Sequence, residues 1–122
     1  MIKQFSGASI WSEDLNNLLP FYRDVLGLAV VMESPGFVLL GADSPAAPAL
    51  ALGTHSEVHG RNPEPARHMV ALDSDDIKAD WQRLKAAGVE FIQEPTGDGY
   101  LTLATLQDPE GNLVQLVQLH QS

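Results

Sequence analysis

The sequence predicts an α+β fold made of two similar β-α-β-β-β modules, and an internal repeat is the main reason. The run SEDL that ends at Leu15 returns as the run SDDI that ends at Ile77, 62 positions later. The run LGLAVV after the first segment is echoed by AGVEFI after the second. Each copy is followed by short apolar runs separated by turn residues, which is the pattern of strands joined by hairpins. A repeat of this size indicates one supersecondary unit used twice.

The two modules are expected to form one domain, because 122 residues is a typical length for a single hydrophobic core. We place the N-terminal module at about residues 1–53 and the C-terminal module at about residues 67–122. A polar linker, at about residues 54–66, joins them. Residues 1–122 are therefore expected to be a single domain.

The first strand is predicted at Ile2–Trp11. Side chains alternate between the two faces of a strand, so Gly7, Ser9 and Trp11 are expected on the same face.

An amphipathic helix is predicted next, at Leu15–Leu28. Its apolar residues recur three or four positions apart and therefore share one face. Gly27 is expected in the left-handed conformation that ends many helices. Pro20 lacks a backbone N–H, so it either kinks this helix or lies near its true start. The apolar residues are Leu15, Leu18, Leu19, Tyr22 and Leu26.

The other elements are placed by short apolar runs and by the turn residues between them. In the N-terminal module, strands are expected at Leu28–Glu33, Gly36–Gly41 and Ala49–Gly53, with a hairpin turn at 34–36. In the C-terminal module, strands are expected at His68–Leu72, Val89–Ile92, Tyr100–Leu106 and Leu113–Leu119, with a helix from Ile77 to Gly88. A loop is expected at 94–99 and a tight turn at 108–112.

Composition and charge exclude several classes of function. The formal net charge of −9 argues against binding nucleic acid through its phosphates. The same charge would attract a cationic ligand, although an acidic surface also serves solubility alone. No run approaches about 18 apolar residues, so no membrane span is predicted. The first residues do not resemble a signal peptide, so we expect a cytoplasmic protein. The absence of cysteine excludes disulfides and thiolate metal sites.

Three segments resemble motifs of the vicinal oxygen chelate superfamily. SEDLNNLLPFYRDVLGL resembles its first helix, SDDIKADWQRLKAAGVEFIQEP its second helix, and DPEGNLVQLVQ its closing hairpin. The superfamily includes glyoxalase I, the extradiol dioxygenases, and the fosfomycin and bleomycin resistance proteins. The resemblance implies paired βαβββ modules whose curled mixed sheets form a cavity. It also implies a homodimer.

The resemblance further implies four positions at which enzymes of this superfamily hold a divalent metal with His and Glu side chains. Counted from the motifs, these positions are Gly7, Ala51, Met69 and Gln115. Glycine and alanine have no side-chain donor, methionine offers a soft thioether suited to copper(I), and glutamine offers one neutral oxygen. We therefore expect no cofactor and no metal-assisted chemistry.

An alternative to the metal-free prediction follows from a different register of the fifth strand. A shift of one residue would turn His68 instead of Met69 toward the cavity. His68 and Gln115 would then hold a divalent metal, and the protein would be a lyase, isomerase or dioxygenase with a rearranged site. Otherwise His68 is a packed or backbone-bonded histidine. His55 and His59 lie in a segment with prolines and glycine, so we expect both to be solvated loop residues.

The predicted cavity face is mostly apolar with aromatic walls, which is the composition of a small-molecule site. Trp11 and Tyr100 are expected to stack on a flat or cationic ligand. The alternative is that the same side chains simply fill the concave face of the sheets as core. The predicted lining residues are Gly7, Ser9, Trp11, Phe37, Ala51, Met69, Ala71, Tyr100 and Gln115.

Three functions remain open from the sequence. The first is a metal-free protein of the bleomycin resistance type, which binds a drug or an aromatic metabolite and performs no chemistry. The second is the metal-dependent enzyme with the rearranged site. The third is an interaction module, such as a ligand sensor that acts through a protein partner. We favour the first, so no catalytic residue is assigned.

Overall fold

The computed structural model describes residues 1–44 and 47–120. Contacts divide the chain into two compact units, Met1–Gly60 and Arg61–Ser122. The boundary falls inside residues 54–66, where the sequence suggests a linker. Each unit contains one four-stranded mixed sheet, so the α+β class and the repeated unit are confirmed.

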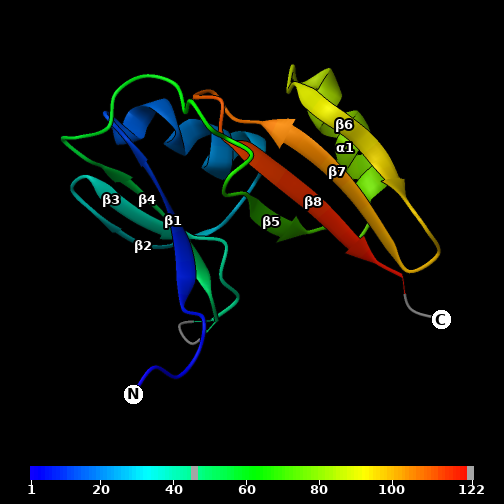
Figure 1. The fold of residues 1–122 in the computed structure, drawn as a ribbon, viewed down its shortest axis with the longest axis horizontal. Helices are drawn as coiled ribbons and strands as arrows, with labels where there is room; N and C mark the ends of the chain where they lie inside the picture. Colours follow the sequence, from blue (N-terminus) through cyan, green and yellow to red (C-terminus); the bar gives the residue numbers. More distant parts are fainter. Residues whose placement is uncertain (45–46, 121–122) are drawn as a thin grey trace. The chain divides into compact units, whose positions relative to one another are not determined.

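The sheet of the N-terminal unit has the strand order β1-β4-β3-β2 (Figure 1). β1 runs parallel to β4, whereas β3 is antiparallel to both of its neighbours. A 3₁₀ turn, η1, and a π-helical turn, η2, connect β1 to β2. The bounds are β1 Gly7–Ser12, η1 Leu15–Asn17, η2 Phe21–Val25, β2 Val30–Ser34, β3 Phe37–Leu40 and β4 Ala49–Thr54.

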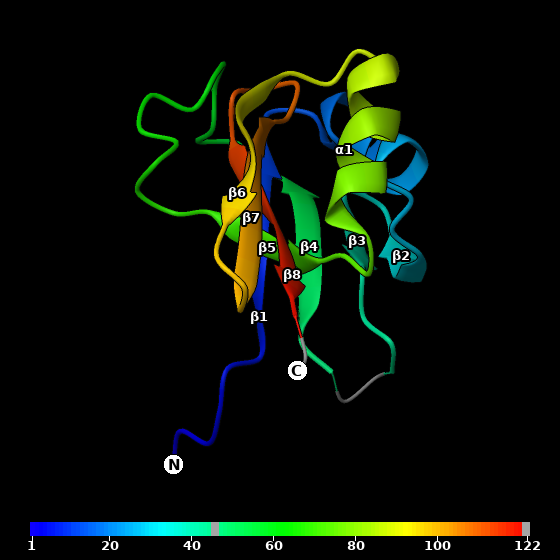
Figure 2. The ribbon, with the colours of Figure 1, turned by 90° about the vertical axis from the view of Figure 1, so that its right-hand side faces the viewer.

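The sheet of the C-terminal unit has the same topology, with the order β5-β8-β7-β6 and a parallel β5–β8 pair. The helix α1 contacts β6, β7 and β8, and Figure 2 shows it along one face of these strands. The bounds are β5 Val70–Asp73, α1 Ile77–Ala86, β6 Phe91–Gly97, β7 Leu101–Gln107 and β8 Leu113–Leu119.

The internal repeat extends to individual hydrogen bonds at the start of each helical segment. Ser12 Oγ accepts from the N–H of Asp14 at 3.1 Å, and Ser74 Oγ accepts from the N–H of Asp76 at 3.2 Å. The first helical N–H of each unit is then bound by a side chain from the last strand of that unit. Leu15 N–H donates to Thr54 Oγ1, and Ile77 N–H donates to Gln118 Oε1, both at 2.9 Å. These bonds satisfy donors that a helix start leaves free.

The helix predicted at Leu15–Leu28 is not continuous, because Pro20 cannot donate the bond that would continue the first turn. Its π-helical part begins directly after Pro20, which is one of the two outcomes expected for this proline. The chain forms a 3₁₀ turn before the proline and a π-helical turn after it, closed by Leu26 N–H donating to Phe21 O at 2.8 Å. The end of the segment is as predicted, since Gly27 has a φ of +82°. The predicted buried face of this segment is also confirmed for four of its five apolar residues, since Leu15, Leu18, Leu19 and Tyr22 are buried.

The first and fifth strands begin later than predicted. β1 starts at Gly7 rather than Ile2, because its neighbour β4 starts at Ala49, the partner of Gly7. β5 starts at Val70 rather than at residue 68. A turn precedes it, in which Arg67 N–H donates to Glu64 O at 3.1 Å and the two side chains form an ion pair. A strand extends only where a neighbouring strand offers backbone partners.

The loop predicted at 94–99 is also wrong, because β6 runs on to Gly97. β6 is the edge strand of its sheet. Pro95 is tolerated there, since a proline on an edge does not interrupt a ladder on both sides. Two register shifts along β6, between Phe91 and Gln93 and between Gln93 and Thr96, accompany it.

Two turns are confirmed. β2 and β3 form a hairpin in which Ser34 pairs with Phe37 around Pro35-Gly36. The turn at 108–112 is closed by Gly111 N–H donating to Asp108 O at 3.1 Å, and β8 has its predicted bounds.

The turn between β6 and β7 provides a pH-dependent prediction. Asp98 Oδ1 accepts from the N–H of Tyr100 at 2.8 Å and of Leu101 at 3.0 Å. These two bonds, that of Tyr100 first, lower the pKa of Asp98. A carboxylate with a lowered folded pKa stabilises the protein above its ordinary pKa and loses this effect as the pH falls. We expect Asp98→Ala to be less stable than wild type at pH 7 in urea unfolding, with the gap narrowing toward pH 2.

Asp98→Asn is the matched control, because an amide oxygen still accepts both bonds but does not titrate in this range. It should keep most of the stability at pH 7. A gap between wild type and Asp98→Ala that stays constant from pH 7 to pH 2 would contradict the role given to the carboxylate.

Candidate functional site

The N-terminal sheet has one face packed under the helical segment and one open face. Val38, Leu40, Leu50 and Leu52 are buried on the packed face. The ladder places Gly7, Ser9 and Trp11 opposite Ala49, Ala51 and Gly53, and it places Phe37 beside Gly53. Five of the predicted lining residues therefore share the open face: Gly7, Ser9, Trp11, Phe37 and Ala51.

An aromatic surface forms at one end of this face, and we call it the Trp11 platform. The six-membered ring of Trp11 lies against Gly53, so closely that a Cβ at position 53 would overlap the ring carbons. The Phe37 ring lies 6.3 Å from the Trp11 ring and the His55 ring lies 5.7 Å from it, edge-on. Trp11 Nε1–H donates to Ser9 Oγ at 3.1 Å. The platform consists of Ser9, Trp11, Phe37, Gly53 and His55.

The side chain of Trp11 is 39% exposed although it is held on several sides. Part of its ring is therefore accessible in a fixed orientation, which lowers the entropy that this side chain must give up when a partner stacks on it. Aromatic rings and apolar groups are the partners that such a surface suits.

His55 is part of this surface, which corrects the expectation that it is a solvated loop residue. Its backbone N–H donates to Ser12 O at 2.9 Å, and this bond continues the β1–β4 pairing by one residue. Its Nδ1 accepts from the N–H of Glu57 at 3.1 Å, which assigns the proton of the neutral ring to Nε2. The sequence offered one signal for this contact, namely that His55 closely follows the predicted strand at Ala49–Gly53, which is β4, the neighbour of the strand that carries Trp11. His59, by contrast, is exposed, with Nδ1 3.8 Å from a carboxylate oxygen of Glu13.

The metal positions of the N-terminal unit do not fit a metal. Gly7 and Ala51 lie on the open face and have no donor atom. A larger side chain at position 7 would not fit either, since a Cβ there would collide with the carbonyl oxygen of Ala49. Among the residues that the structure describes, no group of three or more His, Cys, Asp and Glu side chains is placed to hold a metal ion.

The C-terminal unit places its predicted residues less uniformly. Ala71 pairs with Gln115, and both lie on the face away from α1, where Gln115 is half-buried. His68 and Met69 both precede β5 and are exposed, so neither belongs to the fifth strand, and the expectation of a packed His68 is wrong. Tyr100 lies in the turn before β7 and is 70% exposed, rather than in the strand where it was expected.

The fold and this face define a class of protein: two βαβββ units in one chain, each with a sheet backed by a helical segment. The chain belongs to the Glyoxalase/Bleomycin resistance protein/Dioxygenase superfamily, whose family model matches residues 4–116. The resemblance read from the sequence motifs is therefore confirmed.

The relatives that align over most of this chain have low sequence identity to it. YetH, an uncharacterized protein of Bacillus subtilis (strain 168), is 22% identical, with 95% of this chain and 98% of YetH covered. YurT of the same organism is 49% identical, but only over 35% of this chain and 34% of YurT. TnmS3, an antibiotic binding protein from Streptomyces sp. CB03234, has a similar structure, with a TM-score of 0.72, 23% identity and 98% of each chain covered. A glyoxalase/bleomycin resistance protein/dioxygenase from Nocardioides has a TM-score of 0.68 at 21% identity and covers 100% of this chain and 87% of its own.

No helix within residues 1–44 and 47–120 has the length and apolarity needed to cross a membrane.

Proposed function

We propose that this protein binds a planar aromatic small molecule on the Trp11 platform and does so without a metal. One observation carries the proposal: the open face presents a held aromatic ring, while the metal positions on that face are Gly7 and Ala51. The superfamily's metal-dependent reactions need donors that this face lacks. The likeness to an antibiotic binding protein supports the same class of activity.

The chemistry of the platform suggests the ligand. A flat aromatic group would stack on Trp11 and contact Phe37, and apolar burial together with ring stacking would supply most of the affinity. Ser9 and His55 place polar atoms at the edge of the ring, which would orient a polar substituent. The net charge of −9 would favour ligands that also carry a positive charge.

The proposal includes a homodimer, as the resemblance to the superfamily implies, and a cytoplasmic location, as expected from the lack of a signal peptide pattern. Light scattering coupled to size exclusion measures the mass directly, and the expected value is twice that of the 13.2 kDa chain.

The alternative, a metal-dependent enzyme that uses His68 and Gln115, gains no support from the C-terminal unit. His68 is exposed outside β5, whereas Gln115 lies in the middle of β8. Two such ligands would leave a divalent cation mostly hydrated.

Metal analysis separates the two proposals. We expect protein incubated with Zn²⁺, Mn²⁺ or Ni²⁺ and then dialysed to retain less than about 0.1 metal ion per chain by elemental analysis, because weakly bound surface ions are lost. A ratio near one per chain would refute the metal-free proposal. His68→Ala would then show whether His68 holds the ion, since only the alternative site loses the metal in this variant.

Ligand binding tests the proposal directly. A panel of planar aromatic antibiotics, metal-free bleomycin included, is screened by thermal shift. A ligand that binds only the folded state raises its stability. Every hit is retested in Trp11→Phe and Trp81→Phe, which each keep one of the two tryptophans. A hit that quenches Trp11 in the Trp81→Phe variant supports the platform, and a panel with no such hit counts against it.

A further inference from the structure

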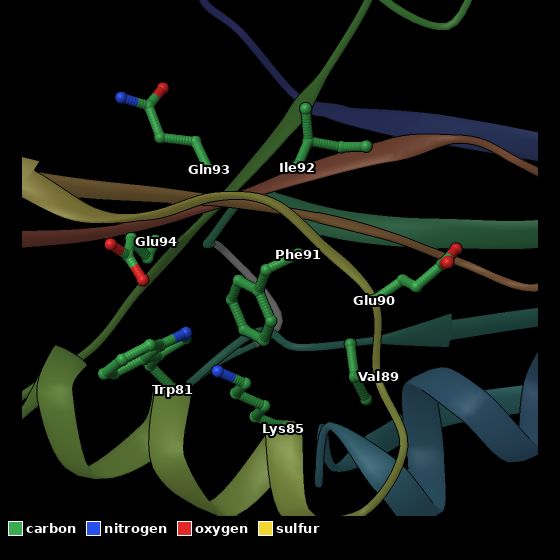
Figure 3. A pocket seen from close by; sticks show the side chains of 8 residues that line it. All are labelled: Trp81, Lys85, Val89, Glu90, Phe91, Ile92, Gln93 and Glu94. Carbon is green, nitrogen blue, oxygen red and sulfur yellow. The ribbon is translucent and has the colours of Figure 1, made fainter.

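A hollow of about 600 Å³ lies in the C-terminal unit on the helix side of the sheet (Figure 3). It is formed between α1 and residues 89–94, which are the end of the segment that leads into β6 and the first part of β6 itself. Ala71 and Gln115 lie on the opposite face of this sheet, and none of the predicted lining residues lines the hollow. Its volume is in the range of small-molecule sites.

The lining of this hollow includes two aromatic rings and two carboxylates. Figure 3 shows Trp81 from the helix and Phe91 from the strand pointing into the space between these elements. Glu94 lies on the Trp81 side of the hollow and Glu90 on the side of Val89. Both rings are half-buried, so each keeps part of its surface open to the hollow.

A cation already lies over one of these rings. Lys85 is one helical turn after Trp81, and its Nζ is 5.2 Å from the centroid of the Trp81 ring. This distance is within the range at which an ammonium is attracted to the face of an indole. The hollow thus already holds one cation over an aromatic ring, namely the ammonium group of Lys85 over Trp81.

The rim of the hollow has an excess of negative charge. Glu90 and Glu94 are exposed, and neither forms an ion pair within the part of the chain that the structure describes. With Lys85 as the one basic lining residue among those that the structure describes, the lining has two negative charges against one positive. A positively charged ligand would gain an ionic partner here, whereas an anion would be repelled.

We propose that this hollow is a second ligand site, specific for an organic monocation with an apolar body, such as a quaternary ammonium or a guanidinium on a hydrocarbon group. The apolar body contacts Phe91 and Val89, and the charge lies between Trp81 and Glu94. Lys85 is the internal competitor of the ligand, because its ammonium occupies the same ring and must move aside. The two aromatic walls exclude fully hydrated inorganic cations as good ligands, since these gain little from contact with apolar groups.

The two tryptophans allow this site to be observed separately from the Trp11 platform. In ¹⁵N-labelled protein, each indole N–H gives its own NMR signal, and Trp11→Phe or Trp81→Phe alone suffices to assign both. The probe is benzyltrimethylammonium chloride, with benzyl alcohol as the uncharged control. We expect a saturable shift of the Trp81 signal with the cation, with a Kd on the order of 1 mM, and no saturable shift with the alcohol.

Two substitutions test the roles of the charges. Lys85→Met should tighten binding of the probe about threefold because it removes the competitor, and Glu94→Gln should weaken it about threefold. The matched controls are Lys3→Met and Glu57→Gln, both at exposed positions that do not line the hollow. They make the same charge changes at residues outside the lining and should leave the Kd within about 1.5-fold of wild type.

The outcomes are distinct from those that test the Trp11 platform. A probe that shifts only the Trp11 signal overturns the second site and leaves the platform intact. Equal effects of Lys85→Met and Lys3→Met, or equal binding of the alcohol and the cation, also overturn it. Saturable, cation-specific binding at Trp81 that tightens in Lys85→Met supports it, whether or not any antibiotic binds at Trp11.

Discussion

Trp11→Ala is expected to weaken binding of a panel ligand about 30-fold or more, equivalent to about 2 kcal/mol. The substitution removes the ring on which the ligand stacks, and it also removes the surface that Phe37 and His55 border. A central, held tryptophan is the type of residue that dominates binding energy in small interfaces. Isothermal titration calorimetry with the tightest ligand of the panel measures the change.

Three further variants show whether the platform acts as a unit. Gly53→Ala should weaken binding in the same direction, because its Cβ would displace the ring of Trp11 without removing it. His55→Ala should have a smaller effect, since His55 contacts the ring only edge-on. Trp81→Ala removes an equally large ring from the other unit and should leave the affinity for this ligand unchanged. Equal losses in Trp11→Ala and His55→Ala would contradict the central position assigned to Trp11.

Asp108→Ala is expected to lower the free energy of unfolding by about 2–4 kcal/mol. Asp108 is 4% exposed, and its side chain holds together the turn before β8 through hydrogen bonds. Its Oδ1 accepts from the N–H of Glu110 at 2.8 Å and of Asn112 at 2.9 Å, and its Oδ2 accepts from Asn112 Nδ2 at 2.8 Å. The alanine variant leaves all three donors without this acceptor. Equilibrium unfolding in urea at pH 7 gives the magnitude.

Two variants separate the hydrogen bonds of Asp108 from its charge. Asp108→Asn keeps an oxygen for the two backbone donors but turns an amide toward Asn112 Nδ2, so its stability should fall between wild type and Asp108→Ala. Asp73→Ala removes an exposed aspartate at the end of β5 and should change stability by less than about 0.5 kcal/mol. A loss in Asp108→Ala no larger than in Asp73→Ala would mean that water replaces the acceptor.

The fold class followed from local signals in the chain. Turn residues such as Pro35-Gly36 and the motif at 108–112 act over a few residues, so the hairpins could be placed without knowing their surroundings. The three-or-four spacing of Leu15, Leu18 and Tyr22 identified the buried side chains correctly, although Pro20 gives the segment 3₁₀ and π-helical geometry. Burial depends on the face toward which a side chain points. Over the few residues of this segment, the change from α-helical to 3₁₀ and π-helical geometry leaves these side chains on the buried face.

The limits of the strands depended on partners that lie far away in the sequence. The start of β1 at Gly7 could be predicted only with the knowledge that β1 pairs in parallel with β4. The exclusion of His68 from β5 could be predicted only with the knowledge of the turn that precedes β5. The extension of β6 through Pro95 needed its position at the sheet edge. A strand needs hydrogen-bond partners, and these are a property of the assembled sheet.

The candidate site divides in the same way. The sequence by itself determined the family, the repeated module, the absence of donors at Gly7 and Ala51, and the common face of Ser9 and Trp11. These follow from residue identity and from the alternation of a strand, both of which are local. Only the tertiary structure decided that Trp11 lies on Gly53 beside His55, that Tyr100 lies outside its predicted strand, and that Trp81 and Phe91 border a hollow in the C-terminal unit. Each of these depends on side chains brought together from different elements, and no spacing along the chain encodes such a contact.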